Sequence, residues 1–103
     1  MAEAFSYKLT TENELFSFDF SQVLAASETI NTASCTVIVK DGTDPSPSSI
    51  LVGSAAIIGA KATQRISGGI SEVTYRLIMT ITTSLSNTYT AVGDLPVYSS
   101  DLV

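Results

Sequence analysis

The sequence lacks histidine and tryptophan, and it contains a single cysteine, Cys35, in 103 residues. Without histidine the chain has no Ser-His-Asp triad, no Cys-His pair and no imidazole ligand for a metal. One cysteine cannot form an intrachain disulfide, which argues against a disulfide-stapled secreted module. We therefore expect no enzymatic activity, no cofactor and no metal.

Positive charge is also scarce. The chain has five Lys and Arg but ten Asp and Glu, so its formal net charge is −5. Binding to a phosphate backbone needs cations gathered on one face, whereas these five are spread along the whole chain. We expect no nucleic-acid partner.

Long apolar runs are missing, although the mean hydropathy is +0.32 and only 15% of residues are charged. The longest apolar run with little charge, residues 50–60, is too short to span a bilayer. The first residues lack the basic start and apolar block of a signal peptide. The sequence therefore predicts no membrane association. Surface buried against other subunits explains the hydropathy, so we expect a homo-oligomer.

What the sequence does contain is strand-forming residues in alternation. Ser, Thr, Val, Ile, Tyr and Phe dominate, and good helix formers are sparse. Apolar and polar residues alternate with a period of two, as in strands with one buried face. The predicted strands cover residues 14–20, 29–40, 61–67, 71–84 and 88–99, and Gly53 and Gly59 divide residues 50–60 into two more short strands or irregular edges.

Several local signals refine this prediction. We expect one short helical turn after residue 20, capped by Ser21, and a β-bulge between Ile30 and Ala33. Residues 41–49 are rich in turn formers, Gly68 and Gly69 predict a turn, and so do residues 84–87. Pro96 predicts that the last strand lies at a sheet edge.

About seven short strands in roughly 100 residues predict an all-β fold, an immunoglobulin-like or fibronectin-like antiparallel β-sandwich. The domain is expected to cover residues 1–103, with termini at 1–9 and 98–103 that are mobile or dock elsewhere.

Two groups of side chains have a chemical interpretation beside a structural one. Cys35 is a nucleophile only in an exposed, electropositive setting, and its apolar strand face favours a buried small hydrophobe instead. Asp41 and Asp44 offer oxygen ligands for a weak calcium site, but the EF-hand spacing is absent and turn formation is the better interpretation.

Two further features favour structure or solvent over chemistry. Glu12 and Glu14 form an acid pair, which we interpret as solvated surface rather than as a glycosidase pair. The hydroxyl of Tyr75, near the start of a strand, is expected to bond nearby backbone and pin a corner of the sandwich.

One row of outward residues suggests an interaction surface. Arg76, Ile78, Thr80 and Thr82 alternate with the apolar face of the longest predicted strand, and Ile38 is a second apolar residue on a face expected to be wet. Outward isoleucines are common singly, but gathered together they mark a contact patch. We predict that these five residues form an interface.

Three stretches together resemble a known family. They are "ENELFSFDFSQVLAASETI", "TASCTV" and "QRISGGISEVTYRLIMTITTS", which share an aromatic–Ser–aromatic–Asp–aromatic–Ser run, Ser-Gly-Gly, Thr-Tyr and Ile-Thr-Thr-Ser in order. This pattern over residues 10–95 is similar to small tailed-bacteriophage virion proteins, the fiber-tail adaptor or head-tail structural proteins.

The resemblance implies an Ig-like structural protein of the virion, assembled in the cytoplasm of the bacterial host. Such an adaptor would assemble around an axis and join portal, tail, nozzle and fiber proteins. A capsid decoration protein bound to the major capsid protein is the first alternative. A carbohydrate-binding sandwich is the second, and the absence of tryptophan for stacking on sugars counts against it.

Overall fold

Alternation of apolar and polar residues builds nearly all of the structure, a computed structural model that describes residues 2–4 and 7–102. The elements are β1 (Ala2–Ala4), β2 (Lys8–Leu9), β3 (Asn13–Asp19), β4 (Ile30–Asp41), the 3-10 helix η1 (Pro47–Ile50), β5 (Leu51–Ile58), β6 (Lys61–Ser67), β7 (Val73–Thr83), β8 (Thr88–Tyr98) and the 3-10 helix η2 (Ser100–Leu102).

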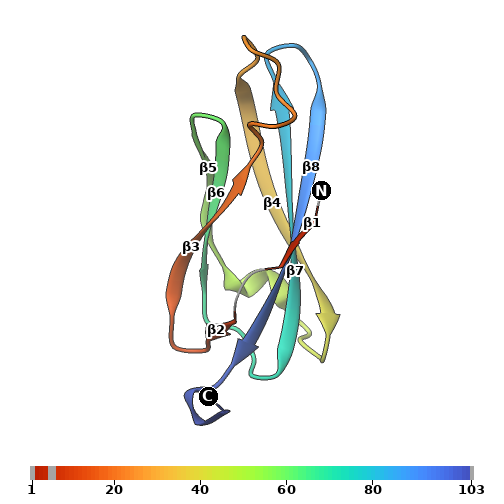
Figure 1. Cartoon of the computed structure of the whole chain (residues 1–103). Coiled ribbons are helices and arrows are strands. Elements are labelled where there is room, and N and C mark those ends of the chain that lie inside the picture. Colours follow the sequence, from red (N-terminus) through yellow and green to blue (C-terminus); the bar gives the residue numbers. More distant parts are fainter. Residues whose placement is uncertain (1, 5–6, 103) are drawn as a thin grey trace.

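The strands form two layers, as Figure 1 shows. The larger sheet has the order β1–β8–β7–β4, and β2 also pairs with β8. The smaller sheet has the order β3–β6–β5. Pairing is antiparallel throughout the smaller sheet and from β4 to β8, whereas β1 and β2 run parallel to β8. The predicted all-β, Ig-like sandwich is confirmed.

The core lies between the inner faces of the two sheets. Every second residue of β7, from Val73 to Ile81, is buried, and every second residue of β8 from Ala91 to Val97 is buried as well. From the smaller sheet, Phe16 and Phe18 pack against them. Each layer thus covers the apolar face of the other and removes it from water.

One end of the sandwich is closed by a tyrosine corner at the start of β7. Tyr75 is fully buried, and its hydroxyl accepts a hydrogen bond from the Ile70 N–H at 2.9 Å. The same hydroxyl donates to Asp44 Oδ2 at 2.6 Å, and Asp44 Oδ1 accepts from the Ser46 N–H. The predicted role of Tyr75 and the turn-forming role of Asp44 are both confirmed.

At the opposite end, a buried carboxylate joins two loops. Glu28 is 6% exposed and accepts hydrogen bonds from the Thr83 hydroxyl, the Asn87 side-chain amide and the Ala25 N–H. These donors stabilise the charged form and hold the pKa of Glu28 below its ordinary value.

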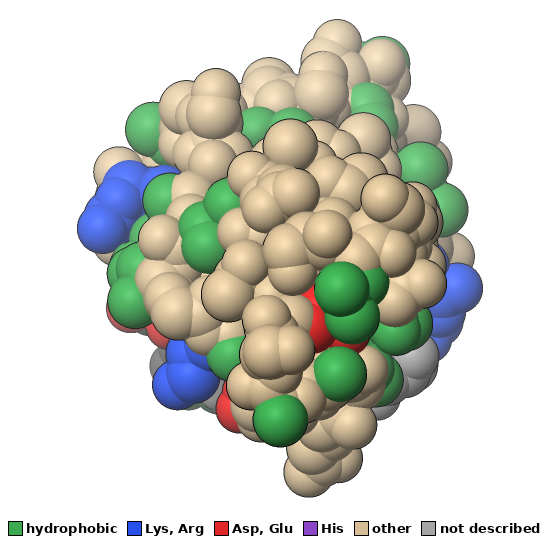
Figure 2. Space-filling model, turned by 90° about the horizontal axis from the view of Figure 1, so that it is seen from above, with side chains coloured by type: hydrophobic (Ala, Val, Ile, Leu, Met, Phe, Trp, Pro, Cys, Tyr) green, Lys and Arg blue, Asp and Glu red, His purple; other side chains and the backbone are tan. Residues whose placement is uncertain are grey.

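Figure 2 views the molecule from above, where uncharged side chains and backbone dominate and Lys and Arg lie at the rim.

Of three further local predictions, two are confirmed only in part and one is wrong. Residues 50–60 divide at Gly59, where β5 has ended and a turn leads to β6. They do not divide at Gly53, because β5 continues there through a register irregularity between Val52 and Ala56, which is the predicted irregular edge. The chain after β3 makes a single helical turn, in which the Leu24 N–H donates to the Phe20 carbonyl oxygen at 3.2 Å, but Ser21 does not cap this turn. Instead the Ser21 N–H donates to Asp19 Oδ1 at 2.8 Å.

Pro96 does not mark a free edge of the sheet either, since β8 pairs with β7 on one side and with β1 and β2 on the other. Along β8, Pro96 lies between the residues that pair with β1 and the residues that pair with β2. The missing N–H of proline is therefore placed where the neighbouring strand is interrupted.

Other turn and bulge predictions are confirmed. The register between β4 and β7 shifts between Ile30 and Thr32. Gly68 and Gly69 have φ of 75° and 104°, which glycine adopts without strain. A Cβ on Gly69 would lie 3.2 Å from a methyl of Val97, so this position also needs the small residue.

The N-terminal segment is tied to the rest of the sandwich by Lys8. This side chain is buried, and its ammonium donates to the carbonyl oxygens of Leu9 at 2.8 Å and Gly68 at 2.5 Å. Burial lowers the pKa of Lys8, against the opposing effect of Glu12. The mobility expected of residues 1–9 and 98–103 stays a prediction. Residues 1, 5, 6 and 103 lie outside the described part of the chain.

Candidate interaction surface

The outer face of the larger sheet carries the residues predicted to form an interface. Strand register aligns β4, β7 and β8 so that their outward side chains form four rows across the sheet. The rows are Ile38–Arg76–Asp94, Thr36–Ile78–Val92, Ser34–Thr80–Thr90 and Thr32–Thr82–Thr88. All five predicted residues lie on this surface.

Charge on this surface is confined to one cluster. Arg76 donates to both carboxylate oxygens of Asp94, at 2.9 and 3.2 Å, and Lys40 reaches over from β4 to Asp94 Oδ2 at 2.7 Å. The guanidinium and then the ammonium lower the pKa of Asp94 to about 2. Two cations thus share one carboxylate, and the other side chains of the four rows are uncharged.

The remaining rows combine hydroxyls with apolar side chains. Thr32 and Thr82 hydrogen bond to each other across β4 and β7. Ile78 lies between Thr36 and Val92, and it is half-buried because strands flank it on both sides. Ile38 belongs to the outer strand of the sheet, and 49% of it is exposed. Outside the charged cluster this surface is uncharged and partly apolar, which is the character of many protein–protein contact surfaces.

The sequence indicated the β7 row but missed its neighbours. Lys40 and Asp94 are the charged members of the surface, and they are far apart in the chain. The alternation within each strand shows which residues point outward, but it does not show which strands are neighbours. The role of the five residues in an interface remains a prediction.

The chemical candidates do not gather into a site. Cys35 is partly buried in the cleft between the two sheets, and burial raises its pKa to about 11, so the thiol stays protonated at neutral pH. Glu12 Oε1 accepts from the Leu9 N–H. Among the residues that the structure describes, no group of three or more His, Cys, Asp or Glu is placed to hold a metal.

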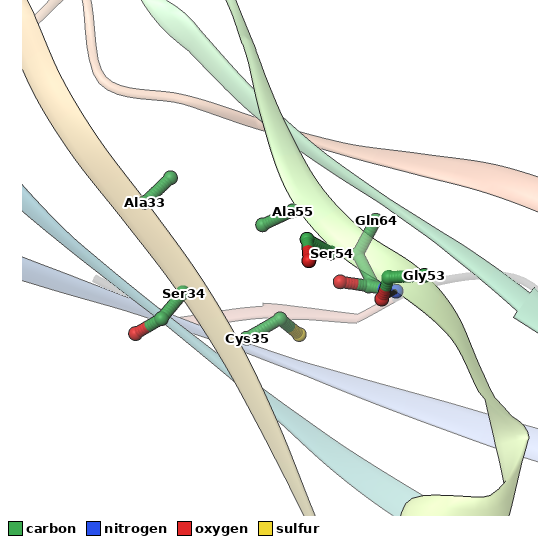
Figure 3. Close-up of a pocket in the computed structure, with 7 residues that line it drawn as sticks. All are labelled: Ala33, Ser34, Cys35, Gly53, Ser54, Ala55 and Gln64. Carbon is green, nitrogen blue, oxygen red and sulfur yellow. Dashed lines mark hydrogen bonds between the residues drawn. The ribbon is translucent and has the colours of Figure 1, made fainter.

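A cleft of about 290 Å³ opens between β4 and β5 (Figure 3). Its lining consists of small residues and one amide, namely Ala33, Ser34, Cys35, Gly53, Ser54, Ala55 and Gln64. The volume is at or below the roughly 300–1,000 Å³ of sites for small molecules. No helix in the described part of the chain is long and apolar enough to cross a membrane.

Fold and surface together define a small β-sandwich whose most developed feature is a sheet face suited to contact with other proteins. Residues 8–95 match the family model of the podophage GP4 fiber-tail adaptor protein gp77, and the chain belongs to that family. This membership supports a structural role in a phage tail. Comparison with curated proteins and with solved structures gave no match.

Proposed function

We propose that the chain is a non-enzymatic adaptor of a podophage virion, which assembles with copies of itself and joins tail or neck proteins to the fibers. The observation that carries this proposal is the outer face of the larger sheet. Three strands present an uncharged surface there, and its one charged cluster is internally paired.

The energetics favour contact over solvation. Covering Ile38 and Ile78 removes apolar area from water at about 25 cal/mol per Å². The paired charges of Arg76 and Asp94 need no new partner when water is excluded, so they add little to the cost of docking. Homo-oligomers with head-to-tail contacts close into rings when the rotation permits it.

The family match supports a place in the tail over a place on the capsid shell. Partners in this proposal are the tail, portal, nozzle and fiber proteins, and the site of assembly is the cytoplasm of the bacterial host. Stoichiometry in purified particles separates the two locations. Copy numbers that follow the symmetry of the tail support the adaptor, whereas hundreds of copies per particle support capsid decoration.

The interface itself is tested by Ile78→Asp. A carboxylate at the centre of the uncharged rows is expected to leave a folded protein, by circular dichroism and thermal unfolding, that no longer assembles. The matched control is Leu15→Asp, which adds the same charge at an exposed apolar position of β3 in the smaller sheet. Sedimentation velocity and incorporation into tails are the measurements. If Ile78→Asp assembles like the unmodified chain, the outer face of the larger sheet is only solvated.

A further inference from the structure

The free edge of β4 is the longest unpaired strand edge in the described part of the molecule. Pairing with β7 occupies one side of β4, and no strand pairs with the other side. Register shifts occur only near its two ends, between Ile30 and Thr32 and between Val39 and Asp41. The stretch between them is regular.

Hydrogen-bond alternation shows which backbone groups reach that edge. The β7–β8 hairpin is closed by a bond from the Thr83 N–H to Asn87 O, so odd-numbered residues of β7 bond to β8 and even-numbered ones to β4. The register then turns the even-numbered residues of β4 toward β7. The N–H and C=O groups of Ala33, Cys35 and Val37 point to the open edge.

This edge has none of the features by which strands avoid pairing. Proteins block exposed edges with charges, prolines or bulges. Residues 30–39 contain no charged residue and no proline. In contrast, the free edge strands of the smaller sheet are protected, since β3 carries Glu14 and Asp19 and β5 is irregular between Val52 and Ala56. Among the described residues, β4 therefore offers the longest regular and uncharged stretch of free edge.

The cleft beside this edge has room for side chains. Figure 3 shows the side chains of Ala33 and Cys35 pointing from β4 toward β5, while Ser34 points away. Because small residues line both walls, about 290 Å³ stays unfilled. The inward side chains of a strand added to β4 would enter this space.

One polar side chain also lines the cleft. Gln64 is 2% exposed, and its amide nitrogen donates to the carbonyls of Val52, Gly53 and Arg65. Figure 3 shows its side-chain oxygen in the cleft, on the side of β4. This oxygen can accept a hydrogen bond from a hydroxyl or amide of an occupant.

We propose that an extended segment of another virion protein adds to the free edge of β4 as an extra strand. The segment is uncharged, and its alternate side chains are β-branched residues such as Val and Thr that fill the cleft, one of them donating to Gln64. Main-chain bonds to β4 supply affinity and the cleft supplies specificity. In a symmetric antiparallel pairing centred on Ser34, a second copy of β4 would bring only Ala33 and Cys35 beside the cleft, and these small side chains would leave most of the space unfilled.

The identity of the partner as a virion protein rests on the proposed adaptor role, and the experiment separates the two. A diazirine amino acid is placed at Ser54, an exposed residue lining the cleft, and particles are assembled with this chain and irradiated. Mass spectrometry is expected to find crosslinks to one extended segment of a different virion protein. Crosslinks to β4 of a second copy, or none while a diazirine at Thr90 still crosslinks, would overturn the strand addition. Copies on the capsid shell rather than the tail would overturn the adaptor role alone.

A backbone variant tests the hydrogen bonds directly. Ala33→Pro removes an N–H that points to the open edge and leaves the bonds from β4 to β7 in place, so the protein is expected to fold. Incorporation into particles should fall at least tenfold. Ala33→Gly, which keeps the N–H, should incorporate like the unmodified chain. Equal incorporation of folded Ala33→Pro would contradict the proposal, and the Ser54 crosslinks decide the matter if this variant does not fold.

Discussion

The two ends of the sandwich are both closed around a carboxylate, but the donors differ. At one end Asp44 accepts a bond from the phenol of Tyr75, which also holds the Ile70 N–H. At the other end Glu28 accepts from a threonine, an asparagine and a backbone amide. One end therefore depends on a single buried ring, and the other on several donors around one charge. We expect the first to be sensitive to mutation and the second to acid.

The largest effect is expected from Tyr75→Phe. Removing the hydroxyl leaves the Ile70 N–H and Asp44 without this partner, at a cost of about 2 kcal/mol in the free energy of unfolding. For a chain of this size the melting temperature should fall by about 10 °C. Tyr89→Phe, at a half-buried tyrosine of β8, is the control and should change the melting temperature far less. Similar losses in both variants would show that the corner contributes nothing special.

A smaller effect is expected from acid at the Glu28 end. The folded pKa of Glu28 lies below its ordinary value of 4.5, so its contribution is fully present above that value. This contribution is lost as the pH falls through the folded pKa. Glu28→Gln should lower the melting temperature at pH 7, and its further loss between pH 5 and 3 should be smaller than that of the unmodified chain. Asp41→Asn, an exposed carboxylate changed to the same kind of amide, should keep the full pH dependence. Parallel pH curves for all three proteins would contradict this role of Glu28.

The smallest effect is expected on the open surface, where Asp94 pairs with Arg76 and Lys40. Asp94→Asn should cost no more than about 1 kcal/mol, because water and salt screen exposed ion pairs. With a pKa of about 2 in place of 3.8, Asp94 contributes its stability above pH 4 and loses it toward pH 2. Denaturant unfolding at low and high salt checks this, since added salt should shrink the difference from the unmodified chain. A larger loss that does not respond to salt would mean that Asp94 acts through packing instead.

Much of the fold was predictable because alternation is local. The buried and exposed faces of β7, the turn at Gly68 and Gly69 and the corner at Tyr75 all follow from short stretches of residues. The errors arose where the extent of an element depends on the strand that pairs with it. β5 runs past Gly53 because β6 pairs with it on both sides of the irregularity, and the amide of Gln64 bonds the carbonyls left free there.

Only part of the candidate surface could be predicted from the sequence. The β7 row follows from one strand, but Lys40 and Asp94 are 54 residues apart and meet only because β7 lies between their strands. The burial of Lys8 could not be predicted from the sequence, because a lysine is almost never fully buried unless it is paired. Its partners are backbone carbonyls, which every residue has.

By itself the sequence determined that this chain forms strands, which side of each strand is apolar, and therefore that two sheets must cover each other. It also determined that the chain has no histidine and only one thiol with which to do chemistry. Only the tertiary structure decided which strands are neighbours, and with that the open edge of β4, the cleft beside it and the pairing of charges on the outer face. The reason is that side-chain alternation acts within a strand, whereas strand order depends on backbone hydrogen bonds that any sequence can make.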